Sequence, residues 1–203
     1  MESKFTNIYD KKKWGSKNGK GSSGTGSNNS PDTKFYINLL MKHIQDYNIK
    51  TVCDIGCGDW EFSKTIDWKG ADIHYTGVDC VKSVIDFNKE NYSCENIEFI
   101  HGDATDIPEG YDLVILKDVI QHWDDEEIKN ILPRIIEKNK FVFLGNGYKF
   151  GRTPSKNNWT ERTLDKIYHY HPIDINKKPF NEIKFNLVNT THRRNKQFNL
   201  IKS

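Results

Sequence analysis

The chain has 203 residues, enough for one domain with a buried core, and a formal net charge of +2 at pH 7, which neither demands nor excludes a polyanionic partner. Its mean hydropathy is −0.76, and no run approaches the roughly 18 apolar residues of a membrane span. No secretory signal is visible in the first 20 residues. We therefore expect a soluble protein without a membrane partner, either cytoplasmic or virus-encoded and intracellular.

The cysteines are spaced too far apart to form a C-x-x-C pair, and they are Cys53, Cys57, Cys80 and Cys94. This spacing indicates reduced thiols in an intracellular protein. A zinc site built from the first three is disfavoured, because Cys53 on a predicted strand should face the opposite side from Asp54. We expect no metal.

The N-terminal segment is poor in apolar side chains and contains a run rich in glycine and serine. This composition is typical of a flexible linker. We predict a flexible N-terminal arm over residues 1–31, a possible lid, followed by one domain over residues 32–203. Pro31 predicts a helix start, with Asp32 or Thr33 as its cap.

Beyond residue 50, short apolar runs typical of strands alternate with amphipathic segments. This alternation predicts an α/β fold in which helices cover both faces of a parallel sheet. The expected strands are residues 51–55, 74–79, 97–101, 111–117 and 141–144. The expected helices are about 60–67 and 81–91, then one that starts with the capping box of Asp124 and Glu127 and that Pro133 must kink or shorten. Two antiparallel strands, 182–188 and 196–201, follow a segment with at most a short helix near 160–168.

The most informative stretch is a predicted strand that ends in a sharp turn through Gly56 and Gly58. A glycine turn between strand and helix lets a ligand approach bare backbone amides. The dinucleotide pattern G-x-G-x-x-G needs a third glycine, but this chain has Glu61 there. Asp54 and Asp59 flank the turn, so a pyrophosphate would be repelled, whereas a ligand with an ammonium and a sulfonium would be attracted.

The residues from Asp54 to Asp59 resemble the first motif of the class I S-adenosylmethionine-dependent methyltransferases, D-x-G-C-G-[Dx]. The resemblance implies S-adenosylmethionine as cofactor. It also implies a doubly wound, mostly parallel seven-stranded sheet with a C-terminal antiparallel hairpin and helices on both faces, over about residues 33–203. The implied binding residues of this motif are Asp54, Gly56, Cys57, Gly58 and Asp59.

Two further acids lie at the end of a predicted strand or just after one. Asp79 lies 25 residues after Asp54, where an acid accepts hydrogen bonds from both ribose hydroxyls of an adenosine; the alternative is that Asp79 only caps the next helix. We place Cys80, next to it, in the same site. Asp103 and Ala104 are similar to a Gly-Asp-Ala stretch that flanks the adenine in this family, although a simple turn also explains the acid.

The segment from Leu116 to Trp123 follows the fourth predicted strand, and ligands of doubly wound sheets bind at such strand ends. It is similar to the fourth motif of small-molecule O-methyltransferases, and it lacks the Pro-Pro-Tyr/Phe of amino-methylating enzymes. Lys117 and Asp118 are expected to line the cofactor. His122 can remove a hydroxyl proton, with Asp118 as the rival base. Alternatively, His122 only packs against the cofactor or caps a helix.

Both ends of the chain are basic, and no acid follows Glu182. They can contact RNA or an anionic small substrate, or simply be solvated. The N-terminal Tyr9, Trp14 and glycine-serine run resemble a prelude in a subgroup of class I methyltransferases that look like glycan-modifying enzymes. That resemblance implies a lid over the cofactor, and an acceptor pocket walled by the Trp159 region and residues 173–181. A disordered tail and a surface loop are the alternatives.

These features together predict a methyltransferase that modifies a hydroxyl of a small molecule, with a sugar or a sugar-containing metabolite as the leading acceptor. Two other functions stay open: an RNA methyltransferase, and a non-catalytic interaction protein with the same fold. A nicotinamide oxidoreductase is disfavoured by Glu61 and by the acids around the turn. The sequence leaves the oligomeric state open.

Overall fold

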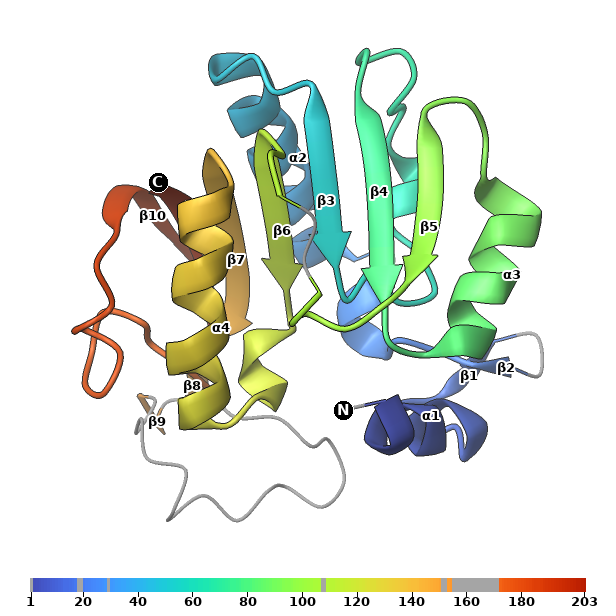
Figure 1. Ribbon diagram of the computed structural model, residues 1–203. Helices are drawn as coiled ribbons and strands as arrows, with labels where there is room; N and C mark the ends of the chain where they lie inside the picture. The colour runs from blue at the N-terminus through green and yellow to red at the C-terminus, as the bar shows by residue number, and fades with distance from the viewer. Residues whose placement is uncertain (1, 18–19, 29, 107–108, 151–152, 155–171) are drawn as a thin grey trace. The chain divides into compact units, whose positions relative to one another are not determined.

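The computed structural model describes residues 2–17, 20–28, 30–106, 109–150, 153–154 and 172–203 (Figure 1). The chain divides into two compact units, Met1–Asp106 and Ile107–Ser203. The two units are described one after the other. The predicted boundary at residue 32 is a different division and stays a prediction.

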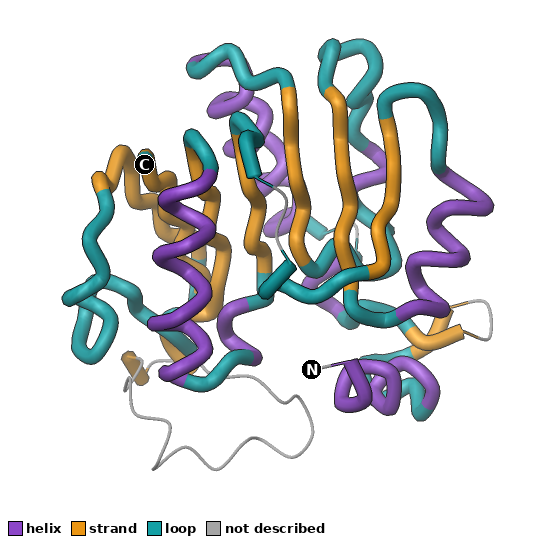
Figure 2. Tube along the Cα trace, viewed as in Figure 1, coloured by secondary structure: helices purple, strands orange, loops and turns teal. Residues whose placement is uncertain are grey.

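Among the described residues of the first unit, three parallel strands lie side by side, with α2 behind the sheet and α3 beside β5 at the right of the view (Figures 1 and 2). The elements in chain order are α1 (Glu2–Asp10), β1 (Ser16–Lys17), β2 (Lys20–Gly21), η1 (Thr25–Ser27), α2 (Pro31–Asp46), β3 (Thr51–Ile55), η2 (Ser63–Thr65), β4 (His74–Asp79), α3 (Lys82–Tyr92) and β5 (Ile97–His101). The predicted strands 51–55, 74–79 and 97–101 are therefore confirmed.

The helix α2 begins at Pro31, before either of the residues predicted to cap it. Ser30 is the N-cap, and its hydroxyl accepts a hydrogen bond from the Thr33 amide at 3.1 Å. Pro31 occupies the first helical position, where its missing N–H costs nothing. The expectation that Asp32 or Thr33 caps this helix was therefore wrong.

The helix expected over 60–67 is reduced to the single 3-10 turn η2. Trp60 adopts φ +55°, the left-handed region, which a continuing right-handed helix excludes. The Ser63 carbonyl then accepts from the amide of Ile66 at 3.1 Å and from the indole N–H of Trp68 at 2.9 Å. These two bonds replace the helical pattern that would carry the segment forward.

Within the described part of the second unit, β6 and β7 are parallel, and β11 joins β7 antiparallel. The elements are β6 (Leu113–Lys117), η3 (Ile120–His122), α4 (Asp125–Lys138), β7 (Phe141–Gly147), β8 (Lys149–Phe150), β9 (Thr153–Pro154), β10 (Asn186–Arg193) and β11 (Lys196–Lys202). The capping box of Asp124 and Glu127 is confirmed. Pro133 lies inside α4, which nevertheless continues to Lys138, so the proline does not end the helix.

The first strand of the C-terminal hairpin, β10, runs from Asn186 to Arg193 instead of over 182–188. Most of its residues are exposed on both faces, as expected for a strand at the edge of a sheet. Such a strand has no buried face to mark its ends in the sequence. Its pairing with β11 sets them instead, because Arg193 pairs with Lys196 and leaves two residues for the turn.

The main sheet has seven strands in the order β10-β11-β7-β6-β3-β4-β5, while β1 pairs with β2 and β8 pairs with β9 in two small sheets. It is mostly parallel with a C-terminal antiparallel hairpin, so the predicted fold class is confirmed. No helix within the described residues is long and apolar enough to span a membrane. The helix expected near 160–168 and the region around Trp159 lie outside the described residues.

Candidate functional site

The turn after β3 has a backbone that favours glycine. Gly56 and Gly58 adopt φ +75° and +57°, both in the left-handed region. A Cβ at Gly58 would also collide with the Ser23 hydroxyl and lie 3.2 Å from the Tyr9 hydroxyl. The turn therefore needs glycine at residue 58 for its dihedral angle and for the close approach of the N-terminal arm.

Each of the four successive amides of this turn donates to an acceptor within the protein. They are Gly56 N to Val78 O (2.7 Å), Cys57 N to Val78 O (3.1 Å), Gly58 N to Asp79 Oδ2 (3.0 Å) and Asp59 N to Ser23 Oγ (2.9 Å). A pyrophosphate-binding turn must instead present its amides to the ligand. The geometry thus agrees with the electrostatic argument against a dinucleotide.

Asp79 ends β4 and is 9% exposed. Its Oδ2 accepts from Gly58, and its Oδ1 accepts from the Val81 amide at 2.9 Å. Burial raises the pKa of Asp79, and these two hydrogen bonds oppose that rise. The carboxylate therefore joins the glycine turn to the start of α3. Each oxygen keeps a second lone pair for a ligand hydroxyl.

Asp54 lies on β3 and is 4% exposed. It accepts a hydrogen bond from the Tyr75 hydroxyl of β4 at 2.7 Å. Burial raises the pKa of Tyr75, and the Asp54 charge adds to that rise, so Tyr75 stays a donor. The contact holds Asp54 against the sheet, and its predicted place near the amino-acid end of the cofactor stays a prediction.

The loops after β4 and β5 are joined, because the Gly102 amide donates to the Asp79 carbonyl at 3.1 Å. This contact brings Asp103 and the buried Ala104 close to Asp79 in the chain fold. Asp103 Oδ1 accepts a hydrogen bond from the Thr105 amide at 3.1 Å. This contact is typical of an aspartate in a turn, which is the alternative to a role in binding adenine. The structure therefore gathers all the predicted cofactor residues of the first unit at the carboxyl ends of β3, β4 and β5.

The cysteine thiols of this site are protonated. Burial raises the pKa of the Cys57 thiol and raises that of Cys80 to about 12. Both are therefore neutral thiols at physiological pH. In the described ranges, no group of three or more His, Cys, Asp or Glu side chains is arranged to hold a metal ion, and the cysteines are free.

Two N-terminal residues, Tyr9 and Ser23, contact the turn. Ser23 pairs with Asp59 in both directions, since its amide donates to Asp59 Oδ2 at 3.0 Å and its hydroxyl accepts from the Asp59 amide. Tyr9 lies 2.6 Å from the Ser23 hydroxyl and packs on Val81 and Val84. The only sequence signal was the prelude resemblance, because serine-rich composition conceals one specific serine.

In the second unit, Asp118 follows β6 with φ +60° and donates its amide to the Gly145 carbonyl at 2.6 Å. Its carboxylate forms ion pairs with Lys117, at 2.8 Å, and with Lys196 of β11. Burial would raise the pKa of Asp118, but the two lysines together hold it well below its usual range. A carboxylate with so low a pKa is a poor proton acceptor. The sequence did not indicate Lys196 as a site residue.

His122 is the last residue of η3 and is half-buried. Its amide donates to the Val119 carbonyl at 2.9 Å, while Asp124, not His122, caps α4. The helix-capping alternative for His122 is thereby excluded. Its role as base or as packing residue stays open at this point.

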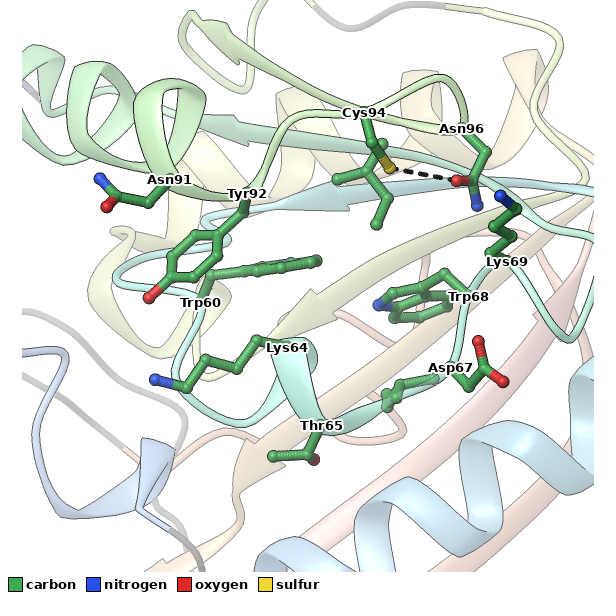
Figure 3. Close-up of a pocket in the computed structure, with 12 residues that line it drawn as sticks. Trp60, Lys64, Thr65, Asp67, Trp68, Lys69, Asn91, Tyr92, Cys94 and Asn96 are labelled. Carbon is green, nitrogen blue, oxygen red and sulfur yellow. Dashed lines mark hydrogen bonds between the residues drawn. The ribbon is translucent and has the colours of Figure 1, made fainter.

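A separate pocket of about 620 Å³ lies in the first unit (Figure 3). Its lining includes Trp60, Trp68 and Tyr92, and Lys64 lies 5.8 Å from the centre of the Tyr92 ring. Trp60 and Trp68 are only 4% and 1% exposed, so these rings belong to the core and offer little surface to a ligand. None of the predicted site residues lines it.

Residues 52–138 match the family model described as a methyltransferase domain (Methyltransf_25). This part of the chain, less than half of its length, is similar to a methyltransferase domain. The matched range begins in β3 and contains the glycine turn, Asp79, Asp103 and the segment with Asp118.

Solved structures share the fold of this chain at low sequence identity. Magnesium protoporphyrin IX methyltransferase (ChlM) from Synechocystis PCC 6803, with bound SAM, has a TM-score of 0.58 and 18% identity, covering 85% of this chain and 80% of that one. The mitomycin 7-O-methyltransferase MmcR has a TM-score of 0.61 and 15% identity, and the match covers 87% of this chain and 59% of that one. The N-methyltransferase NodS from Bradyrhizobium japonicum WM9 has a TM-score of 0.62 and 12% identity, and the match covers 87% of this chain and 98% of that one. No curated protein matches the chain.

Proposed function

We propose that this chain is a class I methyltransferase that uses S-adenosylmethionine to modify a hydroxyl group of a small molecule, with a sugar or a sugar-containing metabolite as the leading acceptor. The observation that carries the proposal is that two features lie within the range of one family match. One is the glycine turn, whose amides donate hydrogen bonds within the protein, and the other is the segment that ends in His122. Small-molecule methyltransferases among the similar structures, such as mitomycin 7-O-methyltransferase, support the acceptor class. A cytoplasmic location is part of the same proposal.

The residues of the first unit fit the cofactor chemically. Asp79 would accept the two ribose hydroxyls, and Asp103 would accept the adenine amine. Asp54 and Asp59 favour the cationic end of the ligand, since opposite charges attract strongly where water is scarce. The walls of the cofactor site would come from Gly56, Cys57, Gly58, Cys80 and Ala104. From the second unit, Lys117 and Asp118 are proposed to contribute to cofactor binding. When bound, S-adenosylmethionine supplies an activated methyl group.

We assign the proton acceptor to His122. An imidazole with a pKa near 6.5 can take a hydroxyl proton at neutral pH, whereas Asp118 is held as a weakly basic carboxylate by two lysines. The proton moves from the acceptor hydroxyl to a ring nitrogen of His122. Asp118 then positions the side chains of Lys117 and Lys196 and balances part of their charge.

We also propose that the N-terminal arm closes over the cofactor turn. The reciprocal pair of Ser23 and Asp59 and the buried Tyr9 support this role. Residues 173–181 are proposed to wall the acceptor, and the Ile173 amide donates to the Gly147 carbonyl at the end of β7, at 2.7 Å. An arm that closes after binding would exclude water from the methyl group.

The test is methyl transfer from labelled S-adenosylmethionine to a panel of sugars and hydroxylated metabolites, with His122→Ala and His74→Ala compared. His74 is an exposed residue at the start of β4, so it is a matched control. We expect His122→Ala to lower turnover about 10²-fold or more while the affinity for S-adenosylhomocysteine is unchanged. Equal turnover of the two variants would remove His122 as base, and labelling of RNA alone would favour the RNA alternative.

A further inference from the structure

A group of polar side chains shares one face of the sheet in the second unit, towards the carboxyl end of β7. Asn146 of β7 pairs with Gln197 of β11, which pairs in turn with His192 of β10. Two residues along β11, Asn199 pairs with Thr190 of β10. Directly paired residues, and residues two apart on a strand, point to the same side of a sheet. We name Asn146, Thr190, His192, Gln197 and Asn199 the amide face.

The inner members of the amide face are buried, and its outer edge is reached by solvent. Asn146, Gln197 and Asn199 are 4%, 5% and 3% exposed, whereas His192 is exposed and Thr190 is half-buried. The row from Asn146 through Gln197 to His192 therefore runs from the interior to the surface. Amide groups in the interior require an explanation, because burial of a polar group costs free energy unless the group is hydrogen-bonded.

Hydrogen bonds link the members of the amide face on β10 and β11. Asn199 Nδ2 donates to Gln197 Oε1 at 3.3 Å, and Asn199 Oδ1 accepts from the Thr190 hydroxyl at 2.8 Å. Gln197 Nε2 lies 3.3 Å from His192 Nε2. Asn146 differs, because its Oδ1 is buried and accepts no hydrogen bond from any residue that the structure describes. Such an acceptor destabilises the free protein, and a ligand that donates to it would remove the cost.

The amide face lies next to the segments that are proposed to serve the acceptor. The Gly147 amide, one residue after Asn146, donates to Gln121 Oε1 at 3.0 Å, and Gln121 directly precedes the proposed base His122. The Gly147 carbonyl accepts from Ile173, the first residue of the proposed acceptor wall, at 2.7 Å. The unpaired oxygen of Asn146 is therefore carried by the residue next to the point where both segments hydrogen-bond to β7.

We infer that the amide face binds the hydroxyl groups of a neutral sugar, one of which donates a hydrogen bond to Asn146 Oδ1. A hydroxyl both donates and accepts, and so do the side-chain amides and the threonine hydroxyl of the amide face. The ring of Tyr148, centred 4.9 Å from the ring of His192, adds an apolar surface for the sugar ring. This inference rests on the proposed function, since it takes the bound sugar to be the methyl acceptor.

The chemistry of the amide face favours a neutral sugar over a charged one. Apart from His192, its side chains cannot ionise, and the atom that lacks a partner is an acceptor. A ligand carboxylate at Asn146 Oδ1 would place a second acceptor beside the first. A ligand ammonium could donate to Asn146 but could not accept from the neighbouring amide N–H groups. Only a hydroxyl satisfies both kinds of group.

The test compares Asn146→Leu with Asn189→Leu. Leucine has nearly the shape of asparagine, so Asn146→Leu removes the unpaired oxygen and keeps the volume. Asn189 of β10 is an exposed control, and it pairs with Leu200, which alternation places on the opposite face of the sheet. Glucose, galactose, mannose and rhamnose are titrated into each protein without cofactor, and ligand-observed NMR follows their binding. Glucuronate and glucosamine are the charged probes.

We expect at least one of the neutral sugars to bind the unmodified protein at least tenfold more tightly than either charged probe. Asn146→Leu should weaken that binding at least tenfold, because a site built to hydrogen-bond a hydroxyl depends on its buried partner. The thermal midpoint of this variant without ligand should be unchanged or higher, since a buried acceptor without a donor has been removed. Asn189→Leu should change the affinity by less than about twofold.

If Asn146→Leu lowers the midpoint as well as the affinity, a second variant decides. His192→Ala, at the exposed edge of the amide face, should weaken the binding of the sugar at least threefold without changing the midpoint. An unchanged affinity in His192→Ala would then overturn the inference, as would a lowered midpoint with unchanged affinity in Asn146→Leu.

The inference is also overturned if none of the neutral sugars binds, if the two leucine variants bind the sugar equally well, or if a charged probe binds alone. Failure of the proposed function gives a different result. S-adenosylhomocysteine, titrated separately, would then fail to bind the unmodified protein and both leucine variants, while the neutral sugar still bound and still depended on Asn146.

Discussion

Asp79 and Asp118 are both largely buried carboxylates at strand ends, but their surroundings move their pKa values in opposite directions. Burial dominates at Asp79 and raises its pKa, although two backbone amides oppose the rise. Two lysines dominate at Asp118 and lower its pKa. The sequence shows two similar residues, each an aspartate after an apolar strand. Only the contacts of the folded chain separate an acid available to hydroxyl donors from one fixed in an ion-pair cluster.

The lowered pKa of Asp118 predicts a specific loss of stability in acid. Its contribution is fully present above the unfolded carboxyl pKa of about 3.9 and is lost as pH falls through the folded value. We expect Asp118→Asn to reduce the free energy of unfolding by about 2 kcal/mol at neutral pH. The difference from the unmodified protein should shrink as pH falls below about 4.

Urea unfolding at several pH values measures this difference. The control is Asp86→Asn, whose ion pair with Lys82 at 2.7 Å is mostly exposed and should contribute less than about 1 kcal/mol. An Asp118→Asn effect as small as the control, or one that does not change with pH, would refute the assigned ion-pair cluster.

The short elements around the glycine turn were the hardest to predict. Both ends of the strand β3 were predicted correctly, because Lys50 and Gly56 bound a short apolar run. The helix predicted over 60–67 was wrong. Trp60 adopts a left-handed conformation that depends on tertiary packing among aromatic rings, such as Tyr75 at 5.6 Å. The N-terminal arm was predicted as linker, and its contacts with the turn depend on single residues that composition does not distinguish.

The arm gives a prediction at the scale of the element. Ser23→Ala removes the acceptor of the Asp59 amide and the partner of Tyr9, a loss of about 1 kcal/mol or more. We expect trypsin to cleave at the exposed lysines 11–13 roughly fivefold faster in this variant, because the arm opens more often.

The matched control is Ser22→Ala, whose hydroxyl makes long contacts of 3.4 Å with Trp14 and Gly24. S-adenosylhomocysteine should slow the cleavage of the unmodified protein. If Ser22→Ala and Ser23→Ala are cleaved at the same rate, the reciprocal pair does not hold the arm.

At the scale of the whole molecule, the alternation of strands and helices was sufficient to predict the class of sheet and its C-terminal hairpin. The ends of β10 were mispredicted because an exposed edge strand lacks a buried face. The cofactor followed from local motifs, Asp54 to Asp59 and Asp79, which lie within the methyltransferase family match. The identity of the acceptor did not, because the residues predicted to contact it, His122 and residues 173–181, are far apart in sequence and form no local motif.

The central claim is that the turn between Ile55 and Trp60 serves a cationic methyl donor and not a diphosphate. The most direct measurement is calorimetric titration of the protein with S-adenosylhomocysteine and with NADH, repeated on Asp79→Asn. We predict that S-adenosylhomocysteine binds, that Asp79→Asn weakens it at least tenfold, equivalent to about 1.4 kcal/mol, and that NADH does not bind. Binding of NADH in place of S-adenosylhomocysteine, or an affinity indifferent to Asp79→Asn, would contradict the account.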